Sequence, residues 1–168
     1  MAAGAVKINF EDDKRDPWDV ASDFKREVEW PNRNDPDLAE VFLEEATEVL
    51  SNLTIELDSL QKDISNKEVL TNVRRLFHTL KGSGRMVGLD YMGEVGWMVE
   101  QTLNRALGGE LPFTPKLFDE VVSMKENFDN WVKILQSGQE VMVDLVSIKK
   151  IFLEINPNLS NHIDIPLD

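Results

Sequence analysis

The chain has 168 residues, of which 42% are hydrophobic, enough for one domain with an ordinary core, and its net charge is −13. It has no cysteine, which excludes disulfides, thiolate zinc sites and cysteine nucleophiles. The negative charge disfavours nucleic-acid binding, and no apolar run approaches the roughly 20 residues of a membrane span. The N-terminus also lacks a signal-peptide core. We therefore expect a cytoplasmic protein that neither spans a membrane nor binds nucleic acid.

Residues 1–34 are rich in charged side chains and carry no sustained apolar stripe apart from a short helical pattern around Val20 to Val28, which indicates a linker or arm. Trp18 and Trp30 each stand beside a proline there. A clear helix follows, with Asp35 as the N-cap and Pro36 at its first position, and its apolar residues keep helical spacing to about Asp63.

Three further long helices are marked by their end signals. The second begins after Asn66 and is expected to end near Gly88, which can adopt the left-handed conformation that closes a helix. The third is expected to be capped by Asp90 and stopped by the 108–109 glycine pair. Its predicted buried stripe is Val95, Met98, Val99, Leu103 and Ala106. The fourth repeats the cap-then-proline signal at Thr114 and Pro115 and runs to Gly138.

Residues 144–152 predict a shorter fifth helix, and no strand pattern or internal repeat is evident. Four long amphipathic helices joined by short connections favour an all-α, up-down antiparallel four-helix bundle over residues 35–138. The accessory C-terminal helix then occupies 139–155, and a polar tail occupies 156–168.

The second helix carries an unusual charge pattern. Residues 69–89 contain no acidic residue but hold four basic ones: Arg74, Arg75, Lys81 and Arg85. His78, one of only two histidines, lies among them on the side opposite the apolar stripe. We therefore expect an exposed imidazole with cations one turn away, suited to handling an anion.

Two glycines follow the histidine inside the same helix, although glycine there costs up to about 1 kcal/mol against alanine. Gly82 lies one turn beyond His78 on the exposed face and would leave a bare patch where another protein could approach. Gly84 lies toward the core and would let a neighbouring helix come close.

The pattern around His78 is compatible with three kinds of anion site. The segment from Gly82 to Gly88 is similar to a G-x-G-x-x-G loop, but it is one residue too long and follows a helix rather than a strand. A bundle metal site would need Glu-x-x-His pairs, which the sequence lacks, so we interpret the glutamates at 40, 44, 45 and 48 as a solvated face. The third reading makes His78 a phosphoryl acceptor, with Lys81 and Arg85 ready for the incoming group.

His78-Thr79-Leu80-Lys81-Gly82-Ser83, followed by Gly88, closely resembles the signature of histidine-containing phosphotransfer domains. The resemblance covers roughly residues 36–138 and implies a four-helix bundle with an exposed phospho-accepting histidine on its second helix. It is nearest to CheA-type chemotaxis kinases, in particular the Chp/Pil kinases that control twitching motility. In those domains a glutamate 22 positions after the histidine bonds the other ring nitrogen, and the ungapped count gives Glu100. Trp97 stands where some CheA domains have a second histidine.

The resemblance implies that His78 receives a phosphoryl group and passes it to an aspartate of a response-regulator receiver domain. The expected partners are that receiver and the catalytic domain of a histidine kinase. No cofactor is expected in this chain, because magnesium would be held by the partners. The chain alone would not use ATP and would be a monomeric piece of a multi-domain kinase. Two alternatives stay open: a non-transferring adaptor that docks such partners, and a metal-dependent bundle enzyme.

The remaining site residues are expected to serve docking or structure. Gly82 and Ser83 would meet the partner, although a helical serine often only bonds its own backbone. Arg74, Arg75 and Arg85 are either part of the docking surface or a solvated basic face. Gly84 and Gly88 are assigned structural roles, whereas Glu94 is expected at the surface and His162 has no supporting neighbours.

Overall fold

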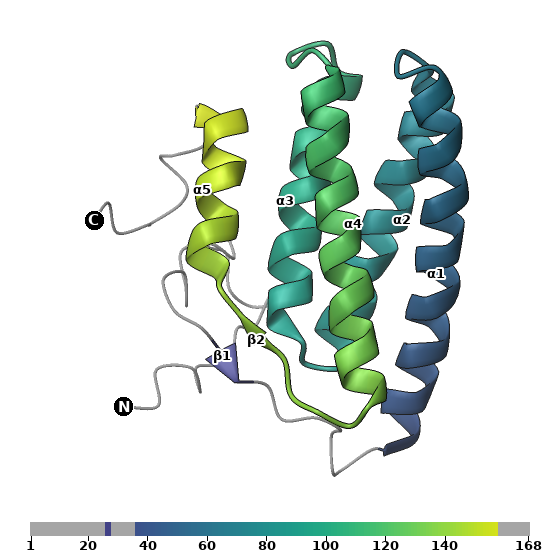
Figure 1. The fold of residues 1–168 in the computed structure, drawn as a ribbon, viewed down its shortest axis with the longest axis vertical. Coiled ribbons are helices and arrows are strands. Elements are labelled where there is room, and N and C mark those ends of the chain that lie inside the picture. Colours follow the sequence, from purple (N-terminus) through teal and green to yellow (C-terminus); the bar gives the residue numbers. More distant parts are fainter. Residues whose placement is uncertain (1–25, 28–35, 158–168) are drawn as a thin grey trace. The chain divides into compact units, whose positions relative to one another are not determined.

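The computed structural model describes residues 26–27 and 36–157. Four long helices form the bundle: α1 (Pro36–Lys62), α2 (Lys67–Met86), α3 (Asp90–Leu107) and α4 (Pro115–Gln136). They alternate in direction as the short connections require, and both α2 and α4 pack against α1 and α3 (Figure 1). The predicted all-α up-down bundle is confirmed. Most of the predicted arm, the tail beyond Pro157, and His162 with it, lie outside the described residues.

A second compact unit contains β1 (Arg26–Glu27), β2 (Met142–Val143) and α5 (Leu145–Ile155). The two strands pair antiparallel, with Arg26 opposite Val143 and Glu27 opposite Met142. The expectation of no strands is therefore wrong in this detail, since two residues are too few to produce a readable alternation. The fifth helix is present and begins after Asp144, whose side chain accepts from the Ser147 amide at 3.3 Å.

The ends of the bundle helices follow from local chemistry. The Asn66 side chain accepts hydrogen bonds from the amides of Glu68 at 3.1 Å and Val69 at 3.2 Å, which caps α2. The Thr114 hydroxyl caps α4 in the same way, with Pro115 in the first turn. Gly88 has a φ of 81°, in the left-handed region, as predicted for the residue that ends α2.

The start of α3 differs from the expectation that Asp90 is its cap. Asp90 is already helical, and the N-cap position is held by Leu89, with no side-chain capping bond. Leu89 is fully buried, and its amide donates to the Gly84 carbonyl at 2.8 Å. The turn at Gly88 thus sends Leu89 into the core. Asp90 then falls in the first helical turn, where an acidic side chain is favoured by the helix dipole.

The core is built from the apolar faces of the four helices and includes a run of aromatic rings. Phe77 of α2 meets Phe128 of α4 edge to face at 6.0 Å, and Phe128 meets Trp131 at 5.1 Å. Trp131 in turn contacts Tyr91 of α3 at 5.0 Å. Such edge-to-face pairs are favoured by the ring quadrupoles. They anchor α2 immediately beside His78.

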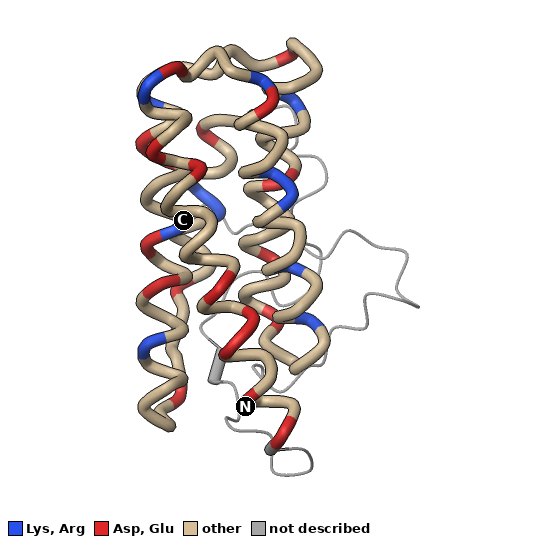
Figure 2. The backbone as a smooth tube through the Cα atoms, turned by 90° about the vertical axis from the view of Figure 1, so that its right-hand side faces the viewer, with Lys and Arg blue, Asp and Glu red and all other residues tan. Residues whose placement is uncertain are grey.

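Charged positions are distributed along all the helices, and acidic positions outnumber basic ones in the part of the chain that is coloured in Figure 2. Among the described residues, no helix combines the length and the apolar character needed to cross a membrane.

Candidate functional site

His78 lies on the outer face of α2. Its neighbour Phe77 is fully buried, as is Leu80, whereas the His78 side chain is 59% exposed. The helical phase read from the sequence therefore predicted the orientation of this imidazole correctly. A ring held this way has one edge toward α3 and the rest open to an approaching molecule.

Glu100 reaches the imidazole from α3, across the seam between the two helices. Its Oε2 lies 2.6 Å from Nδ1 of His78, while its side chain is only 8% exposed. Burial by itself raises the pKa of Glu100, but hydrogen bonds from Lys81 and His78 outweigh it, and the net pKa lies below the ordinary carboxyl value. The ionised carboxylate can only accept, so Nδ1 is the donor. In the neutral ring this leaves the lone pair on Nε2.

The basic segment suggested that Lys81 is free in solvent to meet the incoming group. In the structure it is not. Its ammonium bonds Oε1 of Glu100, and its side chain is only 13% exposed. Each oxygen of the Glu100 carboxylate therefore has its own partner from α2, the His78 imidazole on Oε2 and the Lys81 ammonium on Oε1. This pairing fixes the carboxylate and, through it, the tautomer and the orientation of the His78 ring.

Arg74 is the second cation near this carboxylate. One of its terminal guanidinium nitrogens lies 4.0 Å from Oε2 of Glu100, the oxygen that also holds the histidine. Its side chain is 31% exposed. The adjacent Arg75 is more exposed and makes no ion pair within the described residues. Of the two neighbouring arginines, only Arg74 belongs to the His78–Glu100 cluster.

Glycines let α2 and α3 approach closely beneath this cluster. A Cβ on Gly96 would lie 2.8 Å from Cβ of Lys81 and 3.1 Å from its Cα, and a Cβ on Gly84 would lie 2.7 Å from Cβ of Met92. The structural role predicted for Gly84 agrees with this contact. Gly93 and Gly96 were not identified as contact positions from the sequence. Their three-residue spacing on one face of α3 was the available signal for a close helix crossing.

Arg85 and Glu94 lie differently from the sequence-based prediction. Arg85 is half-buried, and a Cβ on Gly93 would lie 2.7 Å from its Cγ. Burial lowers the pKa of Arg85, and the negative charges of Glu100, Glu94 and Asp90 oppose this shift. Glu94 is completely buried, so its predicted surface position is wrong. The close crossing of α2 and α3 at Gly93, which the sequence pattern did not reveal, accounts for the partial burial of Arg85.

Gly82 leaves open ground beside the histidine. No atom lies within 4 Å of a Cβ built there, apart from the helix's own backbone and chain neighbours. The next residue, Ser83, donates its hydroxyl to Oε1 of Glu45 on α1. The exposed face around His78 thus extends over Gly82 and Ser83 to one acidic side chain of α1.

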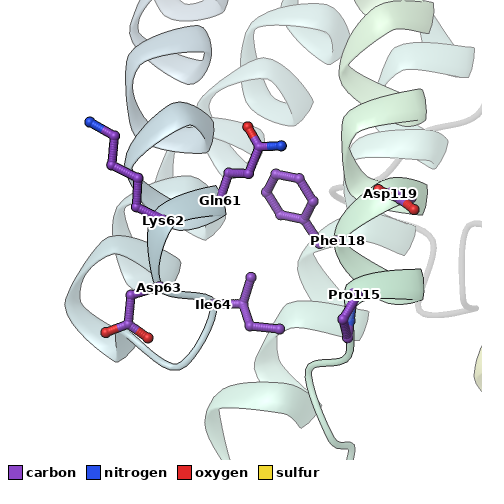
Figure 3. A pocket seen from close by; sticks show the side chains of 7 residues that line it. All are labelled: Gln61, Lys62, Asp63, Ile64, Pro115, Phe118 and Asp119. Atoms are coloured by element: carbon purple, nitrogen blue, oxygen red, sulfur yellow. The ribbon is translucent and has the colours of Figure 1, made fainter.

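The site is a surface rather than a cavity. One pocket in the described region lies between the end of α1 and the start of α4, and no member of the His78 cluster lines it (Figure 3). Its lining residues are Gln61, Lys62, Asp63, Ile64, Pro115, Phe118 and Asp119. No group of three or more potential metal-binding His, Asp or Glu side chains occurs in the described ranges. A surface-exposed histidine is suited to a macromolecular partner that brings its own reacting groups.

An outward imidazole, fixed on an antiparallel bundle by a carboxylate of the next helix, defines a phosphotransfer class of protein. The profile of the Hpt domain family matches residues 37–131, more than half of the chain. The chain therefore belongs to the Hpt domain family.

The chain is similar to part of curated chemotaxis and sensor-kinase proteins. "Chemotaxis protein CheA" of Listeria monocytogenes is 26% identical over 108 residues, covering 64% of this chain and 18% of that protein. "Sensor histidine kinase CheAY" of Helicobacter pylori is 33% identical over 86 residues, covering 51% of this chain and 11% of that protein. The chain spans less than a fifth of these relatives. It is a CheA-like histidine phosphotransfer domain of the kind used in two-component and chemotaxis relays.

Proposed function

We propose that His78 accepts a phosphoryl group on Nε2 and passes it to an aspartate of a response-regulator receiver domain. The observation that carries this proposal is the 2.6 Å contact between Nδ1 of His78 and Oε2 of Glu100, a carboxylate whose pKa is lowered. A donor on Nδ1 leaves the Nε2 lone pair to act as the nucleophile.

The charge balance of the reaction also favours this arrangement. When Nε2 attacks phosphorus, the bond from phosphorus to the donor's leaving oxygen breaks and a P–N bond forms. As long as Nδ1 keeps its proton, the ring becomes positively charged, and Glu100 stabilises that charge at hydrogen-bond distance. In the second step an aspartate oxygen of the receiver attacks phosphorus, the P–N bond breaks and the ring returns to its neutral form.

The partners proposed for these two steps are the catalytic domain of a histidine kinase and a receiver domain. The names of the relatives, a chemotaxis protein and a sensor histidine kinase, support this choice. ATP and magnesium would be bound by those partners. The open ground at Gly82 and the exposed ring fit a protein that must bring its own active site close to His78. The Chp/Pil resemblance, a cytoplasmic location and a monomeric state stay predictions.

Phosphorylation by a CheA-type kinase catalytic domain with ATP and magnesium tests the proposal. We expect a phosphoryl label that is acid-labile and base-stable and that disappears in His78→Gln. The label should then move to a receiver domain added to the purified phosphoprotein. A wild-type domain that binds these partners but takes no label would favour the second candidate, a docking adaptor that retains the motif without turning over phosphate.

A further inference from the structure

We infer that Arg74, rather than Lys81, is the cation that contacts the phosphoryl group on His78. This inference rests on the proposed function. It assigns to one side chain of the basic segment a task that the sequence alone had given to Lys81 and Arg85.

Lys81 already forms an ion pair with Glu100, and breaking that pair costs free energy. Its ammonium bonds Oε1 of Glu100, and both side chains are largely buried, with 13% and 8% exposed. Moving Lys81 onto a phosphoryl group would leave the carboxylate without the cation that is hydrogen-bonded to it, and breaking a buried ion pair is strongly unfavourable. Lys81 therefore serves as the counter-ion of Glu100 before and after transfer.

Arg85 is also committed elsewhere. It lies two turns beyond His78 on α2, with its side chain across Gly93 of α3. Its charge is balanced by Glu100, Glu94 and Asp90, and it is half-buried. With its Cγ and Nε packed against Gly93 and Nε buried, the Arg85 side chain faces the seam between α2 and α3 and not the outer face that carries His78.

Arg74 has the reach and the spare donors. It precedes His78 by one helical turn, and residues four apart on a helix are neighbours. Side chains of a helix lean toward its N-terminus, so the His78 ring leans toward the turn that carries Arg74. The 4.0 Å between the guanidinium and Oε2 of Glu100 exceeds a hydrogen bond, which leaves its N–H groups available.

The chemistry of the guanidinium suits the new charge. Transfer adds a dianionic group with three acceptor oxygens beside a carboxylate that already has its two hydrogen bonds. A guanidinium can bind two phosphoryl oxygens at once through its rigid planar fork, whereas an ammonium acts as a point charge without that fixed geometry. Arg74 would pivot only from the edge of Glu100 to the group on Nε2.

The inference can be tested without a kinase, using phosphoramidate as the phosphoryl donor. In this reaction the P–N bond of phosphoramidate breaks, ammonia leaves and a new bond joins phosphorus to Nε2. The variants are Arg74→Gln, the conservative Arg74→Lys, and Arg75→Gln, which removes the same charge from the adjacent exposed position. Labelling of His78 and its later hydrolysis would be followed by phosphorus NMR.

We expect Arg74→Gln to slow labelling roughly tenfold, as loss of one charge-assisted contact implies, and Arg75→Gln to slow it less than about twofold. Arg74→Lys should recover part of the rate, because it restores the charge but not the fork. Equal rates in the two glutamine variants, or no recovery with lysine, would overturn the role of Arg74. That result would leave phosphorylation of His78 intact, whereas an unlabelled wild-type domain would overturn the proposed function itself.

Discussion

Gly96 of α3 lies directly against the backbone of Lys81 of α2, so close that a methyl group would not fit without movement: its carbon would lie 2.8 Å from Cβ and 3.1 Å from Cα of Lys81. Glu100 follows one turn later on α3. The closeness of the helices at Gly96 therefore sets how far the Glu100 carboxylate can reach toward His78.

Replacing Gly96 with alanine should push α2 and α3 apart at this point. Overpacking of this kind costs about 1–3 kcal/mol of unfolding free energy, and the longer Nδ1–Oε2 contact should also slow phosphorylation of His78. Urea denaturation and kinase labelling measure the two effects. Gly82→Ala is the matched control for stability, because no neighbouring atom lies within 4 Å of its new methyl group. It should leave the unfolding free energy unchanged or raise it by up to about 1 kcal/mol. Equal stabilities of the two variants would contradict the close crossing.

Glu100→Gln should weaken both the fold and the reaction. The change removes the counter-ion of the largely buried Lys81 and the charge that stabilises the phosphorylated ring. We expect a loss of about 1–3 kcal/mol in unfolding free energy and a markedly slower labelling of His78. Glu48→Gln, which removes the same charge from the exposed face of α1, should change the unfolding free energy by less than about 0.5 kcal/mol. An unchanged labelling rate in Glu100→Gln would show that Glu100 does not contribute to the phosphorylation of His78.

The stabilisation from Glu100 should depend on pH in the acid range. Because its folded pKa lies below the ordinary value of 4.5, its contribution is fully present above that pH and is lost as the pH falls through the lowered folded value. The difference in unfolding free energy between the wild-type domain and Glu100→Gln should therefore shrink as the pH falls below 4.5. Chemical denaturation at a series of pH values measures it. A difference that stays constant as far as the bundle remains folded would contradict the lowered pKa.

Gly82→Arg should separate docking from chemistry. The open space around Gly82 accepts a long side chain without loss of packing, but that side chain would occupy the ground beside His78 that a partner needs. We expect transfer to a receiver domain to fall at least tenfold, while labelling by phosphoramidate is not slowed and the thermal unfolding midpoint stays close to that of the wild type. Asn130→Arg, on the exposed face of α4, adds the same charge elsewhere and should transfer normally. Normal transfer by Gly82→Arg would mean that partners do not approach over this glycine.

Local signals predicted most of the bundle. Capping groups at Asn66 and Thr114, the proline at 115 and the glycine at 88 act within a few residues of themselves, so their meaning can be read without the rest of the fold. The strand pair could not be predicted from such local signals. Its two short segments, Arg26–Glu27 and Met142–Val143, pair across more than a hundred residues, and neither carries a pattern of its own.

The sequence by itself determined that His78 stands on the outer face of α2, because helical periodicity separates it from the buried Phe77 and Leu80. The tertiary structure alone decided what surrounds it. Lys81 pairs with Glu100 and Arg85 is half-buried, because the glycines of α3 allow a close helix crossing that periodicity does not encode. Glu94 is completely buried. The buried face of a helix can be predicted from its own sequence. The distance between two helices depends on the side chains of both, and here on the glycines that have none at the crossing.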